Sequence, residues 1–231
     1  MIVETLFPEY GNLYGDPGNM RYLRRCLPQA QFADTPMYAK PVFAEEDVAL
    51  IYMGPMTESA QEKAVAHLKP YTERLRELME KGTVFLLTGN AMEVLGEGIE
   101  NEDGSRIEGL GLLPVTAKRD MMRRYADVFK GRFEDMEIVG FKTQFTKAWP
   151  AQDSAYPFIT VEKGEGLHKG LPYEGVHMHN VFGTYLLGPL LIMNPPFTRY
   201  LLRLLGAEPE TLPFEEEIME AYRRRLRDYE K

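Results

Sequence analysis

Two short, uninterrupted apolar runs constrain the fold of this chain more than any other feature. Residues 48–53 read VALIYM and residues 83–88 read TVFLLT, which is typical of strands that are covered on both faces of a sheet. Between them, apolar residues recur at helical spacing over residues 57–81, and Pro70 divides that stretch into two predicted helices. A buried strand, helices and a second buried strand in this order predict a parallel sheet built from βαβ units.

The remaining segments extend this pattern. The opening MIVETLF predicts a strand, and we expect Asp16 to cap a helix that has Pro17 at its first position. The second half predicts four strand segments (RIEGLGLLPV, MEIVGFKTQFTKAW, YPFITVEK and GVHMHNVFGTYLL), followed by helices that start at residues 194–195 and at Glu215. We therefore predict one α/β domain over residues 1–231, with a mostly parallel twisted sheet and helices on both faces.

Charge and cysteine content exclude several classes of protein. With 27 Lys and Arg against 35 Asp and Glu, the net charge is −8, so the chain offers no general attraction to nucleic-acid phosphates or anionic lipid. The single cysteine, Cys26, cannot form an internal disulfide. The most apolar segment, residues 185–197, contains three prolines and is shorter than the ~20 residues that a membrane span needs. We expect a cytoplasmic protein without a membrane span or a nucleic-acid partner.

The strand, turn and helix predicted at residues 83–96 offer the best position for chemistry. Such a sharp turn exposes one residue at a helix N-terminus, where many α/β enzymes place a nucleophile. The residue here is Gly89, which has no side chain. Taken by itself, the segment is explained as a plain strand-to-helix turn that uses the conformational freedom of glycine.

No other residue offers a ready replacement. Thr88 is adjacent to the turn, but successive strand residues point in opposite directions. We expect Cys26 to be a packing residue. His177 and His179 fall on one face of a predicted strand and could bind a metal, yet no third ligand lies nearby in the sequence. We therefore expect no metal and no cofactor.

Several motifs, spread over nearly the whole chain, carry a family resemblance. They are NLYGDPGN at 12–19, MGP at 53–55 with Gln61, LGLLPVT at 110–116, IVGF at 138–141, EGV at 174–176, NVFGTYL at 180–186, GPLL at 188–191 and NP at 194–195. This set resembles the class I glutamine amidotransferases of the cobyric acid synthase (CobB/CobQ) type, in particular the glutaminase subunits of lipid II isoglutaminyl synthases. The resemblance implies the flavodoxin-like fold of class I amidotransferases.

The chain departs from the family at the positions on which glutamine hydrolysis depends. The resemblance implies that the family's nucleophilic cysteine falls on Gly89 and its histidine base on Leu187. The glutamine-binding segment reads GFKTQFT at 140–146, so its polar triplet is also replaced. Hydrolysis in the family needs a thiolate that an imidazole activates, and glycine and leucine supply neither. The resemblance therefore implies a protein without glutaminase activity.

Three functions remain open at this point. The first is a silent amidotransferase-like subunit that binds or regulates, beside a Mur-ligase-like partner in cell-wall precursor amidation. The others are an enzyme with different chemistry in the inherited pocket and a stand-alone module that binds a small ligand. For a small carboxylate or amide ligand, we expect a pocket formed by Asp16, Gly54, Thr88, Asn90 and Gln144.

Within that pocket, the backbone N–H groups of Gly54 and Asn90 are expected at the positions of an oxyanion hole. The apolar segment around Leu187 has two interpretations. It is either an exposed partner site or an inward plug of the pocket.

Overall fold

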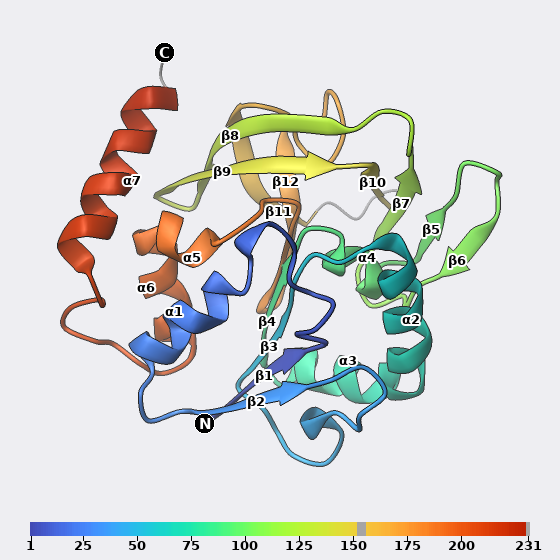
Figure 1. The fold of residues 1–231 in the computed structure, drawn as a ribbon, viewed down its shortest axis with the longest axis horizontal. Coiled ribbons are helices and arrows are strands. Elements are labelled where there is room, and N and C mark those ends of the chain that lie inside the picture. Colours follow the sequence, from blue (N-terminus) through green and yellow to red (C-terminus); the bar gives the residue numbers. More distant parts are fainter. Residues whose placement is uncertain (152–155, 230–231) are drawn as a thin grey trace.

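A mixed β-sheet forms the centre of the molecule (Figure 1). The computed structural model describes residues 1–151 and 156–229, and within them the sheet has nine strands in the order β2-β1-β3-β4-β13-β12-β11-β8-β9. These strands are β1 (Ile2–Leu6), β2 (Gln31–Thr35), β3 (Leu50–Met53), β4 (Val84–Thr88), β8 (Tyr125–Phe133), β9 (Met136–Gln144), β11 (Pro157–Lys163), β12 (Tyr173–Met178) and β13 (Val181–Thr184).

A smaller sheet stands beside the central one. Its four strands in the described residues follow the order β10-β7-β5-β6, with β5 (Gly98–Glu100), β6 (Arg106–Glu108), β7 (Val115–Arg119) and β10 (Thr146–Pro150).

The central sheet is parallel in one half and antiparallel in the other. All neighbours from β2 to β13 are parallel, and all neighbours from β13 to β9 are antiparallel. The α/β fold class is confirmed, but the sheet is less parallel than predicted. Two of the antiparallel pairs follow from short connections. Residues 179–180 alone join β12 to β13, and residues 134–135 join β8 to β9, and so short a turn can connect only antiparallel strands.

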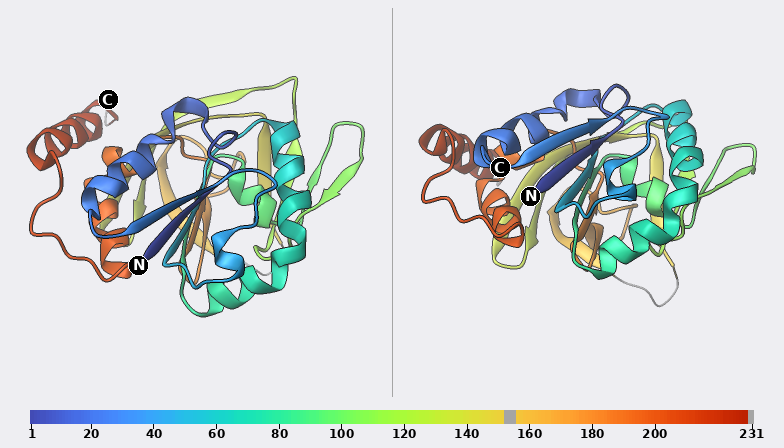
Figure 2. Two further views of the ribbon diagram at one scale, coloured as in Figure 1. Left: turned by 60° about the horizontal axis from the view of Figure 1, so that its bottom comes forward. Right: turned by 90° about the horizontal axis from the view of Figure 1, so that it is seen from below.

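Helices cover both faces of the sheet, as Figures 1 and 2 show. One layer contains α1 (Gly18–Cys26), α5 (Leu190–Met193), α6 (Pro195–Leu204) and α7 (Glu215–Tyr229), and the other contains α2 (Glu58–Leu68), α3 (Thr72–Glu80) and α4 (Ala91–Leu95). Each layer buries its apolar side chains in a separate core cluster against the sheet. Within residues 1–151 and 156–229, three short 3-10 helices complete the fold: η1 (Leu13–Gly15), η2 (Val42–Ala44) and η3 (Lys69–Tyr71). No helix in the described part of the chain is long and apolar enough to span a membrane.

The predicted elements of the first half are confirmed, and those of the second half need correction. The two apolar runs form β3 and β4, whose residues are all buried, and Pro70 lies in η3 between α2 and α3. The segment predicted as one strand over 136–149 is divided at Phe145 into β9 and β10, which belong to different sheets. The segment at 106–115 is mostly not a strand, because Gly111, with φ of +63°, turns the chain and the leucines beside it pack into the core.

Candidate functional site

The site is built around the turn between β4 and α4. The strand ends at Thr88, Gly89 adopts a φ of +59°, and the helix begins at Ala91. A positive φ is the conformation that glycine adopts at little cost. The sharp turn predicted at this position is therefore present, at the carboxyl end of the parallel half of the sheet.

A pocket of about 120 Å³ opens above this turn. Its walls come from the loop after β1, the loop after β3, the turn itself, the end of β9 and the segment after β13. Four of the predicted site residues line it: Gly89, Asn90, Gln144 and Leu187. The other three, which are Asp16, Gly54 and Thr88, lie outside its lining.

Gly54 contributes to the pocket only indirectly. It is buried, and its Cα faces the backbone oxygen of Gly11 so closely that a Cβ would not fit between them. The loop after β3 lines the pocket through Pro55 and Met56 instead. The expectation that Gly54 forms part of the pocket lining is wrong, because its close contact with the first loop keeps it below the surface.

Asp16 is a buried hydrogen-bond acceptor and not a helix cap. The N-cap position of α1 is Pro17, and Asp16 is fully buried below the pocket. Its Oδ2 accepts hydrogen bonds from the hydroxyl groups of Tyr52 on β3 and Thr88 on β4. Burial raises the pKa of the Asp16 carboxyl to about 6, although the Thr88 and Tyr52 hydroxyls oppose that rise. These two hydroxyls need an acceptor in the interior, and this requirement turns the carboxyl inward.

Packing around Gly89 leaves no space for a larger residue. A Cβ added at Gly89 would lie 2.5 Å from Cβ of Pro55 and 3.2 Å from Cδ2 of Leu187. Leu187 is only 2% exposed, so of the two interpretations of its segment the inward one is confirmed. Leu187 forms the wall of the pocket on the side of β13.

Below the turn, Glu93 is the centre of a buried network. The carboxylate of Glu93 on α4 accepts hydrogen bonds from Gln61 Nε2 at 2.7 Å and from the Tyr185 hydroxyl at 2.8 Å. Gln61 Nε2 also donates to the backbone oxygen of Asn90, and its Oε1 accepts from Arg119 Nη2 at 2.8 Å. Burial raises the pKa of Glu93 to about 7, against the effect of its hydrogen bonds and of the Arg119 charge.

Asn90 fixes the loop after β3 against the turn. Its side-chain oxygen accepts from the backbone N–H of Met56 at 3.0 Å, and its Nδ2 donates to the backbone oxygen of Met56 at 2.9 Å. The side chain of Asn90 is therefore already occupied, and its role is to hold Pro55 over Gly89.

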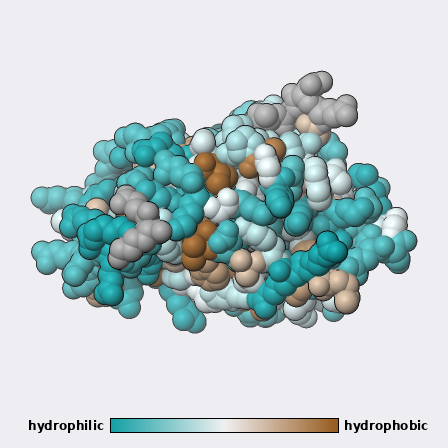
Figure 3. Space-filling view, turned by 90° about the horizontal axis from the view of Figure 1, so that it is seen from above, coloured by the Kyte–Doolittle hydropathy of each residue, from teal (hydrophilic) through white to brown (hydrophobic). Residues whose placement is uncertain are grey.

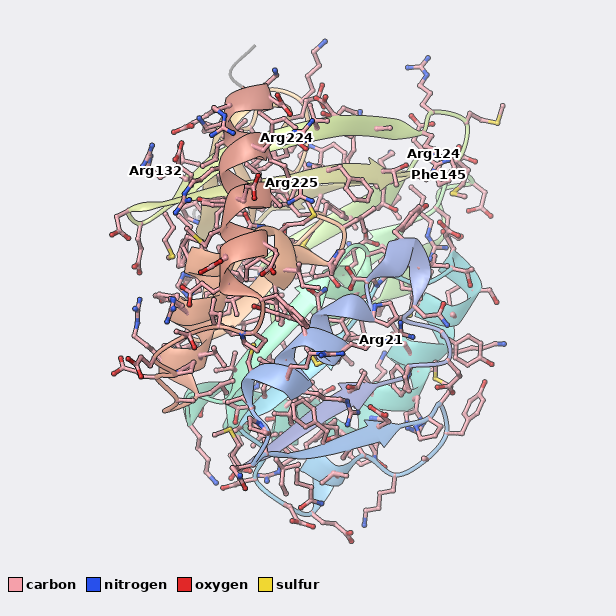
Figure 4. All side chains as sticks on the ribbon, turned by 60° about the vertical axis from the view of Figure 1, so that its left-hand side comes forward. Arg21, Arg124, Arg132, Phe145, Arg224 and Arg225 are labelled. Carbon is pink, nitrogen blue, oxygen red and sulfur yellow. The ribbon has the colours of Figure 1, made fainter. Side chains whose placement is uncertain are left out.

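Polar groups at the mouth of the pocket come from η1, the loop before β8 and the end of β9. Arg124 donates from Nε to the hydroxyl of Thr143 at 2.6 Å and from Nη2 to the hydroxyl of Tyr14 at 3.3 Å. Arg124 and Phe145 lie together in Figure 4. Gln144 donates from Nε2 to the backbone oxygen of Thr146 at 2.7 Å, whereas its Oε1 is buried without a partner. The pocket thus offers one unused acceptor.

The remaining candidates have structural roles. Cys26, the last residue of α1, is buried in the core, as predicted. His177 stacks on Phe182, with ring centroids 4.5 Å apart, whereas His179 lies in the turn after β12 with φ of +54°. The two histidines therefore do not share one strand face. Among the described residues no group of three or more His, Cys, Asp or Glu is placed to hold a metal ion.

Sequence reasoning missed Glu93, Tyr185 and Tyr52 as parts of this site. One signal was available for Glu93: it is the only charged residue in the helix AMEVL, which directly follows a fully buried strand. An acidic residue within so apolar a helix is more commonly exposed, and only the positions of Gln61 and Tyr185 explain its burial.

Comparison with known proteins gives consistent similarities. Residues 3–194 match the CobB/CobQ-like glutamine amidotransferase domain. The chain is 28% identical over 212 residues to the subunit GatD of lipid II isoglutaminyl synthase (glutamine-hydrolyzing) from Staphylococcus aureus, covering 88% of this chain and 83% of the relative. It is also 28% identical to the same subunit from Streptococcus pneumoniae, covering 80% of this chain and 74% of the relative.

Solved structures support the fold. A crystal structure of a glutamine amidotransferase covers 89% of this chain and all of its own, with a TM-score of 0.58 and 14% identity. The structure of PurLQS from Thermotoga maritima covers 97% of this chain and 98% of its own, with a TM-score of 0.56 and 14% identity. The amidotransferase-like fold that the resemblance implied is confirmed.

The first prediction concerns Glu93. Its pKa of about 7 lies above its ordinary value of 4.5, so the folded state favours the protonated form. The stability that this preference contributes is complete below about pH 4.5 and is lost as the pH rises to about 7. We expect wild type to lose roughly 3 kcal/mol relative to Glu93→Gln across that window, measured by urea unfolding at several pH values. Parallel stability curves for the two proteins would contradict this.

The second prediction concerns Leu187. An aspartate there would place a carboxylate in a buried apolar contact, so we expect Leu187→Asp to lower the free energy of unfolding by about 3 kcal/mol or more. The volume-conserving control Leu187→Met should cost less than about 1.5 kcal/mol. A melting temperature of Leu187→Asp close to that of wild type would show that the side chain is exposed in solution.

Proposed function

The chain belongs to the CobB/CobQ-like glutamine amidotransferase family, and we propose that it acts there without glutaminase activity, as a binding or regulatory subunit of a ligase-like partner. In this proposal, Gly89 occupies the position of the nucleophile and Leu187 that of the general base. The protein retains the amidotransferase scaffold and uses it for association.

The packing at Gly89 carries the proposal. A Cβ there would meet Cβ of Pro55 at 2.5 Å, a separation that real Cβ contacts do not show. The turn therefore lacks a nucleophilic side chain and also the space for one. The pocket opens beside this position, but Pro55 and Leu187 occupy the space that a Cβ at Gly89 would need.

Other residues of the pocket do not restore the chemistry. Of the described residues that line it, none is Cys, Ser, Lys or His. The hydroxyl of Thr88, next to the turn, donates to Asp16 below the pocket. Cys26 lies in the α1 layer, where burial raises its pKa to about 11, so its thiol is protonated near neutral pH.

A partner is proposed because of the relatives. The two similar proteins from Staphylococcus aureus and Streptococcus pneumoniae are each named as a subunit of lipid II isoglutaminyl synthase. For this chain we propose a Mur-ligase-like partner and, as the class of reaction, amidation of a cell-wall precursor. Leu187 is buried and unable to contact a partner. We propose that the contact is made by Arg124, which bonds to Thr143 and Tyr14 of the pocket lining, and by Met122, which is 87% exposed and precedes Arg124 by two residues in the chain.

One observation favours binding of a small ligand as a second candidate function. The Oε1 of Gln144 is buried without a partner, and Gln144 lines the pocket. An unpaired buried acceptor costs about 1–3 kcal/mol, which a ligand with an N–H donor would offset. Of the two ligand classes expected from the sequence, an amide supplies such a donor and a carboxylate does not.

We expect the purified protein to release no ammonia from L-glutamine, because the site contains neither a thiolate nor an imidazole. The same assay on Gly89→Cys and on Gly89→Cys/Leu187→His should also be negative, since Pro55 blocks the new side chain. Adding Pro55→Gly to the double variant removes the Cβ that blocks the new cysteine. This triple variant then tests whether the rest of the scaffold can still support glutamine hydrolysis. Ammonia release by wild type would refute the proposal.

A stability measurement checks the steric argument separately. Gly89→Ala should lower the free energy of unfolding by about 1–3 kcal/mol more than Gly206→Ala. Gly206 is the matched control because its φ of +71° is similarly strained for alanine, whereas nothing lies within 4 Å of the added Cβ. Equal losses of unfolding free energy in the two variants would show that Pro55 can move away from the added Cβ at little cost.

Affinity capture from the source cell tests the partner. We expect the tagged protein to retain an ATP-dependent ligase-like protein, and Met122→Asp to reduce that capture without lowering the melting temperature. Capture of no such protein, with the tagged chain folded and monodisperse, would favour the stand-alone binding module instead.

A further inference from the structure

A second cavity lies on the α1 side of the sheet and is separate from the pocket at Gly89. It has a volume of about 300 Å³ and is lined by residues of β1, β2, β3, the loop after β1 and α1. In the strand order β2-β1-β3, the chain moves to one side of β1 for β2 and to the other side for β3. This reversal is the topological switch point, where doubly wound α/β folds bind ligands beyond the carboxyl ends of the strands.

The floor of the cavity contains an unsatisfied polar group. Thr5 on β1 is 6% exposed, and its hydroxyl is buried without a hydrogen-bond partner although it lines the cavity. Tyr52 lies beside it on β3, but its hydroxyl already donates to Asp16. A buried hydroxyl without a partner is uncommon in folded proteins. At the floor of the cavity, the Thr5 hydroxyl is the group to which a ligand would hydrogen-bond.

The wall formed by α1 supplies a free positive charge. Arg21 and Arg24, which are one helical turn apart, both line the cavity. Arg24 is held by the two carboxylate oxygens of Asp34, each at 3.0 Å. The guanidinium of Arg21 has no hydrogen bond or ion pair within the described part of the chain. Figure 4 shows Arg21 on α1, well apart from Arg124 and Phe145 at the mouth of the other pocket.

The rest of the lining is apolar. Pro8, Pro17 and Met20 complete the wall, and Asp34 is neutralised by Arg24. The cavity therefore combines one free guanidinium, one free hydroxyl and an apolar surface, in a protein whose net charge is −8. A guanidinium with free N–H donors is suited to bind a carboxylate or a phosphate.

We propose that this cavity binds a small molecule with a single oxyanion group, a carboxylate or a phosphate, on an apolar body. Arg21 pairs with the oxyanion, the hydroxyl of Thr5 hydrogen-bonds to the ligand at the floor of the cavity, and the apolar body packs against Met20 and the two prolines. The proposal does not depend on the function of the pocket at Gly89, because no residue lines both cavities.

Calorimetric titration of the full-length protein at low salt tests the site with defined probes. The probes are benzoate and phenyl phosphate, with benzamide as the uncharged analogue and inorganic phosphate as the anion without an apolar body. We expect saturable binding of benzoate, of phenyl phosphate or of both, and the stronger of the two identifies the oxyanion. Benzamide and inorganic phosphate should bind at least about tenfold more weakly, because each lacks one of the two features.

Variants locate the binding. Arg21→Gln and Thr5→Val should each lower the affinity for the probe by about tenfold, whereas Arg25→Gln should leave the affinity unchanged. Arg25 is the matched control, since it lies on the same helix and carries the same charge but contacts Phe214 outside the cavity. Ligand-free Thr5→Val should melt no lower than wild type, because valine removes an unsatisfied hydroxyl and keeps the shape.

Three results would overturn the proposal. The first is that neither aromatic anion shows saturable binding up to about 10 mM, a range that corresponds to negligible affinity. The second is equal affinity of Arg21→Gln and wild type for the probe. The third is a lower melting temperature of ligand-free Thr5→Val, which would show that the hydroxyl has a structural partner. Binding of benzamide as tight as that of benzoate would likewise exclude an oxyanion site.

Discussion

The buried carboxyl group of Asp16 determines how the first loop meets the sheet. It accepts hydrogen bonds from hydroxyls on β3 and β4 and lies against Gly188, where no Cβ would fit. Three segments that are distant in sequence thus converge on one side chain. Since an unpaired buried acceptor or donor costs about 1–3 kcal/mol, the loop, the two strand ends and the segment after β13 keep fixed relative positions. The turn at Gly89 directly follows one of these strand ends.

This framework explains why the space above Gly89 can close without disturbing the fold. The turn is held from below by Asp16 through Thr88 and from the side by Asn90, which pairs with the backbone of Met56. Neither of these contacts involves the side chain at position 89. A glycine at that position therefore leaves the framework intact and lets Pro55 and Leu187 pack together, and burial of a leucine is worth about 1.5–3 kcal/mol.

Local patterns predicted the parts of the fold that depend on local forces. The runs that form β3 and β4 are apolar throughout because both of their faces are covered, and Pro70 interrupts a helix for reasons of backbone geometry. Asp16 was misassigned because capping rules consider only neighbours in sequence, whereas its donors, Tyr52 and Thr88, are 36 and 72 residues away. The segment GVHMHNVFGTYLL was predicted as one strand, whereas the structure has the β12–β13 hairpin there. The turn was missed because it places His179, and not a glycine, at positive φ. Gly89 and Leu187 gained meaning only from the family resemblance.

Asp16 lines neither cavity, but its hydrogen bonds with Tyr52 and Thr88 restrict how the cavity beside α1 can recognise a ligand. Tyr52 lines that cavity, but its hydroxyl is committed to Asp16, and Thr88, the other donor to Asp16, precedes the Gly89 turn. A ligand that drew the Tyr52 hydroxyl away would remove a donor from a buried carboxyl group, at a cost of about 1–3 kcal/mol. Recognition through Thr5 and Arg21 avoids that cost because neither group has a partner to lose. The unpaired groups of the cavity are therefore the ones that are free to bind without weakening the framework.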